Sequence, residues 1–260
     1  MISGTASLEG VLADSDQLPV KEKKITYENV GYRVIRLHPS QLELVWKGDD
    51  GKPMRGYDVV QTHYGKKNRK CLFLMNAGIF EPGGIPSGLH IQDGKLLLPL
   101  NHKAGKGNFY LKPNGVFWWS RHSKSTMCGV ASTDKFSKNT WLQLKKHLDG
   151  KEGRKMSLNA VQSGPLLLQA GRIHPAFNKD SSSTLYRNGV GVDSDGNIVF
   201  VVTDKKQEVN LYGFARVFLH LGCKNALFLD GDLSHMELSP KKPIRSHLFG
   251  AVFVVSEKKQ

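Results

Sequence analysis

Short apolar runs separated by polar turns make up most of this 260-residue chain. Runs of four to eight apolar residues bounded by glycine, proline, asparagine or aspartate are typical of β-strands. Where a short turn separates two such runs, the pattern predicts a β-hairpin. Strands are predicted at residues 32–37, 42–46, 71–75, 108–111, 116–119, 165–169, 172–173, 190–192, 198–202, 226–229 and 248–255. Hairpin turns are predicted at Asp93-Gly94, Pro113-Asn114-Gly115, Ala170-Gly171 and Asp195-Gly196.

Two segments carry a helical pattern instead. One covers residues 139–148 and ends at Asp149-Gly150. The other covers residues 209–221, where apolar side chains recur on one face at helical spacing. Asn210 fits the N-cap of this second helix, and Gly222 fits the position after its last residue. We therefore predict a single α+β domain, because two helices are too few to cover both faces of a doubly wound parallel sheet.

The chain is expected to consist of a short tail and one domain. Residues 1–24 are small, polar and finally charged, which predicts a mobile N-terminal tail. Residues 25–260 contain no internal repeat and no low-complexity linker. No run approaches the ~20 apolar residues of a membrane span, and the N-terminus lacks a signal-peptide pattern. A cytoplasmic location is expected from this start, or a periplasmic or secreted one if a leader has been removed.

The formal net charge is +14, with basic residues spread along the whole chain. Such a charge favours an anionic partner, such as a phosphate ester, an acidic glycan, nucleic acid or an anionic lipid surface, and does not choose among them. The three cysteines include no Cys-x-x-Cys pair, which argues against a zinc site and a disulfide framework. Cys71 and Cys223 are expected to be buried as small apolar side chains.

The segment richest in potentially reactive side chains follows the predicted strand at 226–229. Asp230, Asp232 and Ser234 alternate there after an abrupt Asp-Gly turn, so a rigid strand presents two carboxylates at its tip. Paired carboxylates serve as nucleophile or base and as acid in glycoside hydrolysis. They also bind Mg²⁺ or Ca²⁺, although no EF-hand pattern is present here.

Three other strand ends carry polar groups beside glycines. Asn76 and Gly78 follow an apolar run, and an asparagine side chain suits hydrogen bonding to sugar hydroxyls. Ser163 and Gly164 lie in Gln162-Ser-Gly-Pro165, where a hydroxyl and free amides could hold an oxyanion. Arg187 opens the hairpin that ends at Asp204, and arginine captures phosphate or carboxylate with two N–H groups.

Two of the ten histidines lie close to these motifs in the sequence. His174 follows the Ser163 turn and His235 follows Ser234, so both are candidate proton carriers. No His-Glu-x-x-His or comparable metal-binding array is present.

Taken in order, Asn76-Ala-Gly-Ile-Phe80, Gln162-Ser-Gly-Pro165, Arg187 with Gly189-Val-Gly191, and Ala226-Leu-Phe-Leu-Asp-Gly231 with Ser234 resemble the phosphodiester glycosidase family. The resemblance covers residues 70–255 and implies an α+β domain with a strongly curved mixed β-sheet. It implies catalytic roles for Asp230, Arg187 and Asp204. It implies substrate-binding roles for Asn76, Gly78, Ser163, Gly164, Gly231, Asp232 and Ser234. Asp232 and Leu233 replace glycines of the family pattern, so a bulkier and more acidic mouth is expected.

The resemblance also implies the reaction, which is cleavage of the bond between a sugar's anomeric carbon and a phosphodiester oxygen. The expected partner is a sugar phosphodiester or an anionic glycan, and no cofactor is expected, with a divalent cation at Asp230 and Asp232 left open. Two alternatives stay open: a non-catalytic binder of anionic glycans, and a metal-dependent phosphodiesterase or nuclease. A nucleic-acid binder is not expected, because the aromatic residues follow strand patterns and form no recognition motif.

Overall fold

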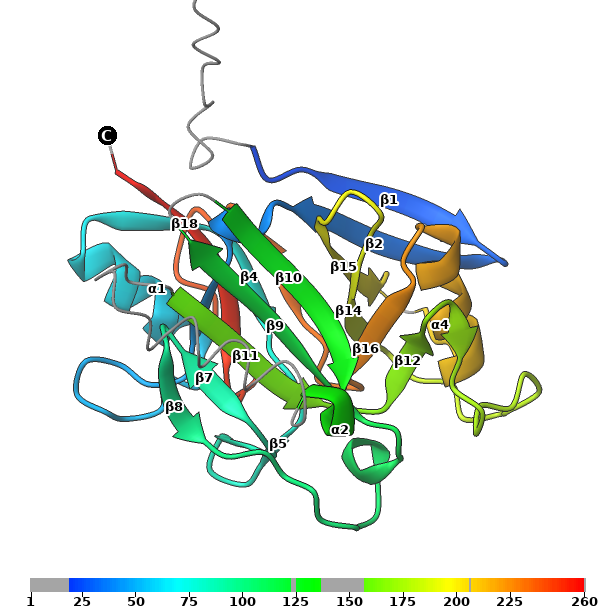
Figure 1. Ribbon diagram of the computed structural model, residues 1–260. Coiled ribbons are helices and arrows are strands. Elements are labelled where there is room, and N and C mark those ends of the chain that lie inside the picture. The colour runs from blue at the N-terminus through cyan, green and yellow to red at the C-terminus, as the bar shows by residue number, and fades with distance from the viewer. Residues whose placement is uncertain (1–18, 123–124, 137–156, 206, 260) are drawn as a thin grey trace, which may run out of the picture.

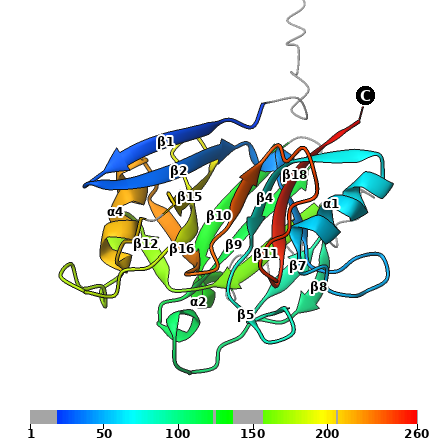
Figure 2. The same cartoon turned by 180° about the vertical axis from the view of Figure 1, so that it is seen from behind.

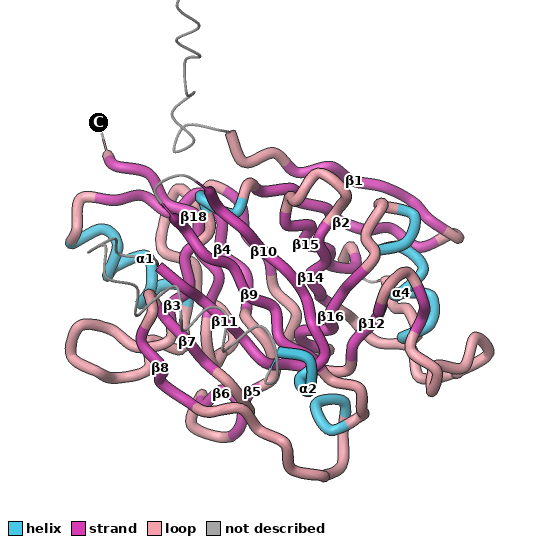
Figure 3. The backbone as a smooth tube through the Cα atoms, in the orientation of Figure 1, coloured by secondary structure: helices cyan, strands magenta, loops and turns pink. Residues whose placement is uncertain are grey.

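A computed structural model describes residues 19–122, 125–136, 157–205 and 207–259 (Figure 1). Strands predominate, and all of the strand pairs in this part of the chain are antiparallel (Figure 3). The α+β prediction is confirmed. The strands lie in several antiparallel sheets, so the expectation of one mixed sheet is wrong, while its strong curvature stays a prediction.

The first sheet has seven strands in the order β1 (Glu22–Tyr27), β2 (Val30–Leu37), β15 (Ile198–Thr203), β14 (Asn188–Val192), β16 (Asn225–Asp230), β12 (Leu166–Gln169) and β13 (Arg172–Ile173). The second has the order β10 (Ser125–Ser132), β9 (Gly115–His122), β11 (Ser157–Ser163), β7 (His90–Gln92) and β8 (Lys95–Leu98). The third has the order β17 (Met236–Leu238), β4 (Arg69–Asn76), β18 (Val252–Lys258) and β3 (Glu43–Val45). A small hairpin pairs β5 (Phe80–Glu81) with β6 (Ile85–Pro86).

One hydrophobic core is shared by the three larger sheets. Phe200 of the first sheet lies 5.4 Å from Phe73 and 5.0 Å from Phe253 of the third, measured between ring centroids. Phe117 of the second sheet lies 5.8 Å from the same Phe253. Because side chains alternate along a strand, Phe200 faces this core while its neighbours Val199 and Val201 face the opposite side of the sheet.

Helix α4 (Leu211–His220) covers that opposite side, as predicted for 209–221. The Asn210 side chain accepts a hydrogen bond from Gly213 N at 2.9 Å, and Gly222 has φ +84, so both predicted caps are confirmed. The helix lies close to β14 because the strand has no side chain at Gly189 and Gly191. A Cβ at Gly191 would stand 2.9 Å from Phe218 Cδ1.

Helix α1 (Tyr57–Lys66) was not predicted. It packs Tyr57, Val60 and Tyr64 against the outer face of the third sheet, on the far side of the molecule from α4 (Figure 2). The spacing of these three residues is a helical signal, but the polar residues between them and Gly65 hide it. Among the described residues, the remaining short helices are α2 (Thr133–Lys135), η2 (Pro39–Gln41) and η3 (Asn108–Tyr110).

Several boundaries differ from the predictions. Residues 108–110 form η3, so the expected hairpin around Pro113-Asn114-Gly115 is absent; the Asn114 side chain donates to Phe109 O instead. Glu22 to Lys24, predicted as tail, pair with β2. The last strand starts at Val252, four residues later than predicted. The predicted tail up to residue 18 and the helix at 139–148 lie outside the described residues.

The hairpins β7–β8, β12–β13 and β14–β15 are confirmed, because left-handed residues occupy their turns at Asp93-Gly94, Ala170-Gly171 and Gly196. Cys71 and Cys223 are buried, as expected. In the part of the chain that the structure describes, no helix is both long enough and apolar enough to cross a membrane.

The packing of α4 yields a stability prediction. Phe218→Ala should lower the free energy of unfolding by about 3–5 kcal/mol, because it opens a cavity between α4 and the first sheet. Leu219→Ala is the matched control: it removes a 38% exposed side chain from the same helix and should cost less than about 1 kcal/mol. Urea denaturation of both variants measures the difference. Equal losses would contradict this packing.

Candidate functional site

The candidate site lies where the first and third sheets meet. Asp230 is the last residue of β16, Asn188 is the first residue of β14, and Asn76 is the last residue of β4. Asn76 Nδ2 donates a 2.7 Å hydrogen bond to Asp230 Oδ2. Two residues that the sequence placed at separate strand tips are thus in direct contact.

The orientation of the Asn76 amide is fixed by two further donors. Its Oδ1 accepts hydrogen bonds from His235 N at 3.0 Å and from Asn188 Nδ2 at 2.7 Å. Asn76 and Asn188 are both fully buried. Because a backbone N–H can only donate, His235 N forces the oxygen of Asn76 toward itself and the NH₂ group toward Asp230.

Asp230 is a partly exposed carboxyl with an unusual pKa. Burial raises its pKa to about 6 from the ordinary 3.8, and the negative charge of Asp232 adds to this rise. Two hydrogen bonds act the other way: Asp230 Oδ1 accepts from Gly231 N at 2.7 Å, and Asn76 donates to Oδ2. A carboxyl that titrates near neutrality can both accept and release a proton under ordinary conditions.

The turn after β16 holds this carboxyl in place. The Ser234 hydroxyl contacts Asp230 O at 3.1 Å and Gly231 O at 2.6 Å, and Ser234 N donates to Gly231 O at 2.8 Å. Asp232 lies between these residues, and its side chain is exposed. Ser234 therefore closes the turn through its backbone contacts, while Asp232 is presented to solvent.

Ser163 and Gly78 hold together the strands that carry the site. Ser163 is fully buried; its hydroxyl donates to Leu229 O at 3.1 Å and accepts from Ile79 N at 3.3 Å. Gly78 has φ +90, and a Cβ there would stand 3.1 Å from Val161 Cγ1 and 3.4 Å from the Ser163 Cβ. Ser163 therefore links β11 and β16 to the segment after β4, and Gly78 allows that close approach.

Gly164 and Gln162 position the same segment. A Cβ on Gly164 would stand 2.6 Å from the Asn114 Cβ, so only glycine fits. The Gln162 amide is used completely: Oε1 accepts from Leu89 N and Asn101 N, and Nε2 donates to Asn101 O. Gln162 and Gly164 thus hold β11 against the segments around Leu89, Asn101 and Asn114.

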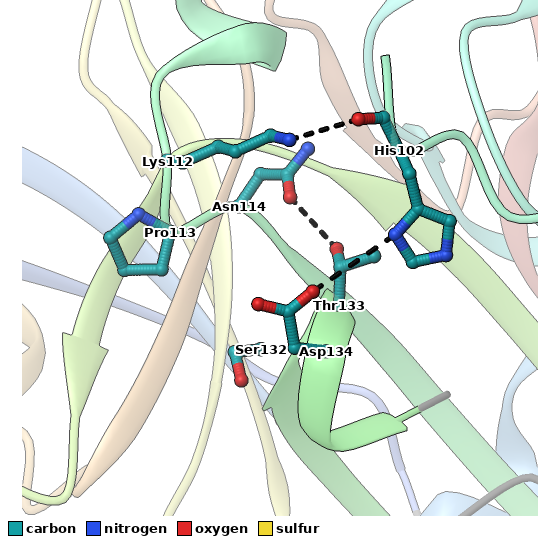
Figure 4. A pocket seen from close by; sticks show the side chains of 7 residues that line it. All are labelled: His102, Lys112, Pro113, Asn114, Ser132, Thr133 and Asp134. Carbon is teal, nitrogen blue, oxygen red and sulfur yellow. Dashed lines mark hydrogen bonds and ion pairs between the residues drawn. The ribbon is translucent and has the colours of Figure 1, made fainter. Parts of the chain in front are cut away.

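A small cavity of about 30 Å³ adjoins Asn114 (Figure 4). Thr133 Oγ1 donates to Asn114 Oδ1 at 2.8 Å and accepts from Gln162 Nε2 at 3.2 Å. Lys112 Nζ donates to His102 O on the opposite wall. The cavity has room for about one water molecule and no more.

Arg187 is deeply buried, with 1% of its surface exposed. Its Nε donates to Val209 O at 2.6 Å and its Nη2 donates to Ser183 O at 3.0 Å, while Nη1 has no hydrogen-bond partner among the described residues. Burial lowers its pKa to about 10, and the charge of Asp232 partly offsets this. Arg187 thus binds the segment before α4 through Nε and Nη2, whereas Nη1 makes no hydrogen bond to the described residues.

Asp204 lies at the end of β15, beside the β1–β2 turn. Its N–H donates to Gly31 O at 2.9 Å, and its carboxylate accepts from Lys205 N. Among the described residues, none of the hydrogen bonds that link Asn76, Asn188 and Asp230 includes Asp204. Its catalytic role stays a prediction.

The two candidate histidines occupy different places. His235 Nε2 pairs with Glu237 Oε1 at 2.7 Å, and the His235 backbone contacts Asn76, so His235 belongs to the site. His174 is buried, and its Nδ1 accepts from Ala176 N in the turn after β13. Of the two histidines, only His235 is in contact with the residues that hold Asp230.

Sequence reasoning missed two members of this site. Tyr57 is fully buried, and its hydroxyl donates to His235 O at 2.6 Å. Burial, with the charges of Glu237 and Asp230, raises its pKa well above the ordinary range. Asn188 lies between Arg187 and Gly189 of the family motif but was not singled out. Within the described ranges no three His, Cys, Asp or Glu side chains gather closely enough to bind a metal.

With this geometry in place, comparisons with known proteins are informative. A profile of the phosphodiester glycosidase family matches residues 69–236, and the chain belongs to that family. It is 34% identical over 163 residues to the uncharacterized protein YigE of Escherichia coli (strain K12), which covers 62% of this chain. The chain spans 56% of the length of YigE, little more than half.

The fold is shared with solved structures of low sequence identity. The catalytic domain of zebrafish N-acetylglucosamine-1-phosphodiester alpha-N-acetylglucosaminidase, auto-inhibited by its pro-peptide, superposes with a TM-score of 0.56 at 19% identity, covering 91% of this chain and 81% of that one. A hypothetical protein from Synechocystis superposes with a TM-score of 0.53 at 12% identity, covering 91% and 61%. These likenesses establish the fold.

The raised pKa of Asp230 predicts a pH-dependent stability. The native protein binds the proton more tightly than the unfolded chain, so this stabilisation is complete below about pH 4 and is lost as the pH rises through 6. The stability of the wild type relative to Asp230→Asn should therefore fall by about 1–3 kcal/mol between pH 4 and pH 8. Denaturant titrations across this range measure it. A difference that does not change with pH would contradict the raised pKa.

Proposed function

We propose that this protein is a hydrolase that cleaves the bond between the anomeric carbon of a sugar and a phosphodiester oxygen. The observation that carries the proposal is the Asp230 carboxyl, held by Asn76 and Gly231 at the tip of β16 with a pKa near neutrality. Membership of the phosphodiester glycosidase family and the shared fold with the zebrafish enzyme support it.

Asp230 is the proposed nucleophile or base. The leaving group is the phosphate monoester that remains when the bond to the anomeric carbon breaks. It is weakly basic and needs little protonation, so one carboxylate suffices for the reaction. As a nucleophile, Asp230 would attack the anomeric carbon and water would later release the sugar; as a base, it would take the proton of an attacking water. Asn76 fixes the direction of the carboxylate in either case.

A basic segment near the site fits an anionic substrate. Residues 239–251 connect β17 to β18, and their last residue, Ala251, accepts a hydrogen bond from Ala77 N beside Asn76. Lys241, Lys242 and Arg245 are exposed on this segment, and no acidic residue occurs between Glu237 and Glu257. The local excess of positive charge raises the concentration of an anionic substrate near the site.

Arg187 is proposed to act from beneath the turn that carries Asp232. Its guanidinium is charged, and its Nη1 is free of hydrogen bonds to the described residues. Because Nη1 is buried, the guanidinium would stabilise negative charge on the phosphodiester through space. Because Arg187 also holds two backbone carbonyls, Arg187→Lys is a better test of this role than Arg187→Ala.

A second candidate function is non-catalytic binding of an anionic glycan. Asp232 and Leu233 stand where the family pattern has glycines, and the basic segment supplies binding charge without chemistry. Saturable binding of a sugar phosphodiester with no product released would favour this function over hydrolysis.

The central prediction concerns Asp230. Asp230→Asn should lower kcat/KM for sugar-1-phosphodiesters by about 10²–10⁴-fold, because the amide cannot act as nucleophile or base. Release of the free sugar from a panel of such substrates, with and without a chelator, measures the loss. Asp195→Asn, in the exposed β14–β15 turn, is the matched control and should retain wild-type rates. Wild-type rates in Asp230→Asn would show that Asp230 is neither the nucleophile nor the base.

The same carboxyl predicts the pH profile. Because the reactive form is the carboxylate, kcat/KM should rise about tenfold per pH unit below about 6 and level off above it. Initial rates between pH 4.5 and pH 8 at low substrate concentration measure this limb. A profile that is flat through pH 6 would show that Asp230 does not titrate in the free enzyme.

A further inference from the structure

One atom in the hydrogen-bond network around Asn76 has no partner among the described residues. Asn188 is fully buried, and its Nδ2 donates to Asn76 Oδ1, but its own Oδ1 accepts no hydrogen bond from any described residue. Buried carboxamide oxygens nearly always have a donor, so this one requires an explanation.

The orientation of the Asn188 amide is fixed by the Asn76 oxygen that it contacts. The His235 N–H donates to Asn76 Oδ1, and that oxygen can then receive only another donor from Asn188. A reversed Asn188 amide would bring two oxygens together. The unpartnered atom of Asn188 is therefore an acceptor.

The surroundings of Asn188 Oδ1 restrict what can donate to it. The atom is fully buried, so its donor is either a group packed beside it or an enclosed water molecule. In the sheet, Asn188 lies between Val202 on β15 and Asp230 on β16. Val202 has no polar side-chain atom. The side chains of Asn188 and Asp230 both reach the Asn76 amide, so they project to the same side of the sheet.

We propose that the acid form of Asp230 donates its proton to Asn188 Oδ1, which makes Asn188 a positioning residue that stabilises the protonated carboxyl. The proton comes from solvent and stays on Asp230; ionisation of Asp230 leaves Asn188 Oδ1 without a donor again. The raised pKa of Asp230 agrees with an environment that favours the acid form. This proposal deepens the proposed hydrolase function. Of its tests, only the kinetic one depends on that function.

Other charges act on Asp230, and the test must separate them from Asn188. Asp232, in the turn after β16, raises the Asp230 pKa through space. The other titratable or charged groups on the elements around the site are Tyr57 of α1, Arg187 just before β14, His235 just before β17 and Glu237 of β17. Asn76 is bonded to both residues and transmits part of the ionisation of Asp230 to Asn188. A direct hydrogen bond should make the Asn188 response larger than that of Asn76.

The experiment is an NMR titration of the full chain labelled with ¹³C and ¹⁵N between pH 4.5 and pH 8. The side-chain ¹³Cγ signals of Asp230 and Asn188 should titrate with one shared midpoint, and the Asn188 response should vanish in Asp230→Asn. Asn159 is the matched control: it is fully buried on β11 with an unpartnered Nδ2, and it should not follow this midpoint. An Asn188 signal that stays constant while Asp230 titrates, or that shifts no more than the signal of Asn76, would overturn the proposal.

A second variant tests the contact in a different way. Asn188→Asp places a second carboxyl against Asp230, so the pair should share one proton and titrate in two steps, the upper one at least about one pH unit above the wild-type midpoint. The acid limb of kcat/KM should move to higher pH by the same amount. An unchanged Asp230 midpoint in the folded variant would contradict the contact. If the variant does not fold, the wild-type titration decides.

The two proposals can fail separately. Wild-type protein that releases no sugar from any phosphodiester would refute the proposed hydrolase function and leave the titration result intact. Turnover that depends on Asp230, together with a constant Asn188 signal, would retain the hydrolase function and refute the role of Asn188.

Discussion

The side-chain amide of Asn76 is the interaction on which the site depends. It accepts hydrogen bonds from His235 N and Asn188 Nδ2 and donates one to Asp230, so both of its polar atoms are used. Its partners belong to the first sheet and to the segment that leads into β17 of the third sheet. An unpaired group at this depth would cost about 1–3 kcal/mol. The position of the Asp230 carboxyl therefore depends on how two sheets pack around their shared aromatic core.

Local signals in the sequence were sufficient for much of the fold. The turns at Asp93-Gly94, Ala170-Gly171 and Asp195-Gly196 have the left-handed backbone that glycine permits, and each joins the two strands expected. The caps of α4 were equally readable. Helix α1 was missed, because its buried face consists of only three residues separated by polar ones. The division of the strands among several sheets depends on long-range pairing, which a single sequence does not reveal.

The candidate site was partly predictable for the same reason. Asn76 and Asp230 follow predicted apolar strands and Ser163 precedes one, and the structure brings these three residues together. The strand β11, which ends at Ser163, was not predicted. The roles of Asn188 and Tyr57 arise only from contacts between distant segments, such as the bond from Tyr57 to His235 O. Arg187 shows the opposite case: its position in the sequence resembled an exposed phosphate-binding residue, yet its guanidinium is buried and bonds to two carbonyls.

The buried hydroxyl of Ser163 has a consequence for how such proteins diversify. It connects Ile79 N to Leu229 O and so holds the back of the site through the framework of the fold. The front of the site is formed by turns, including Asp232 and Leu233, whose side chains make few of these connections. Surface turns tolerate change far better than strands do. Descendants of one ancestral chain can therefore change the residues of these turns while inheriting the same hydrogen-bonded strand ends.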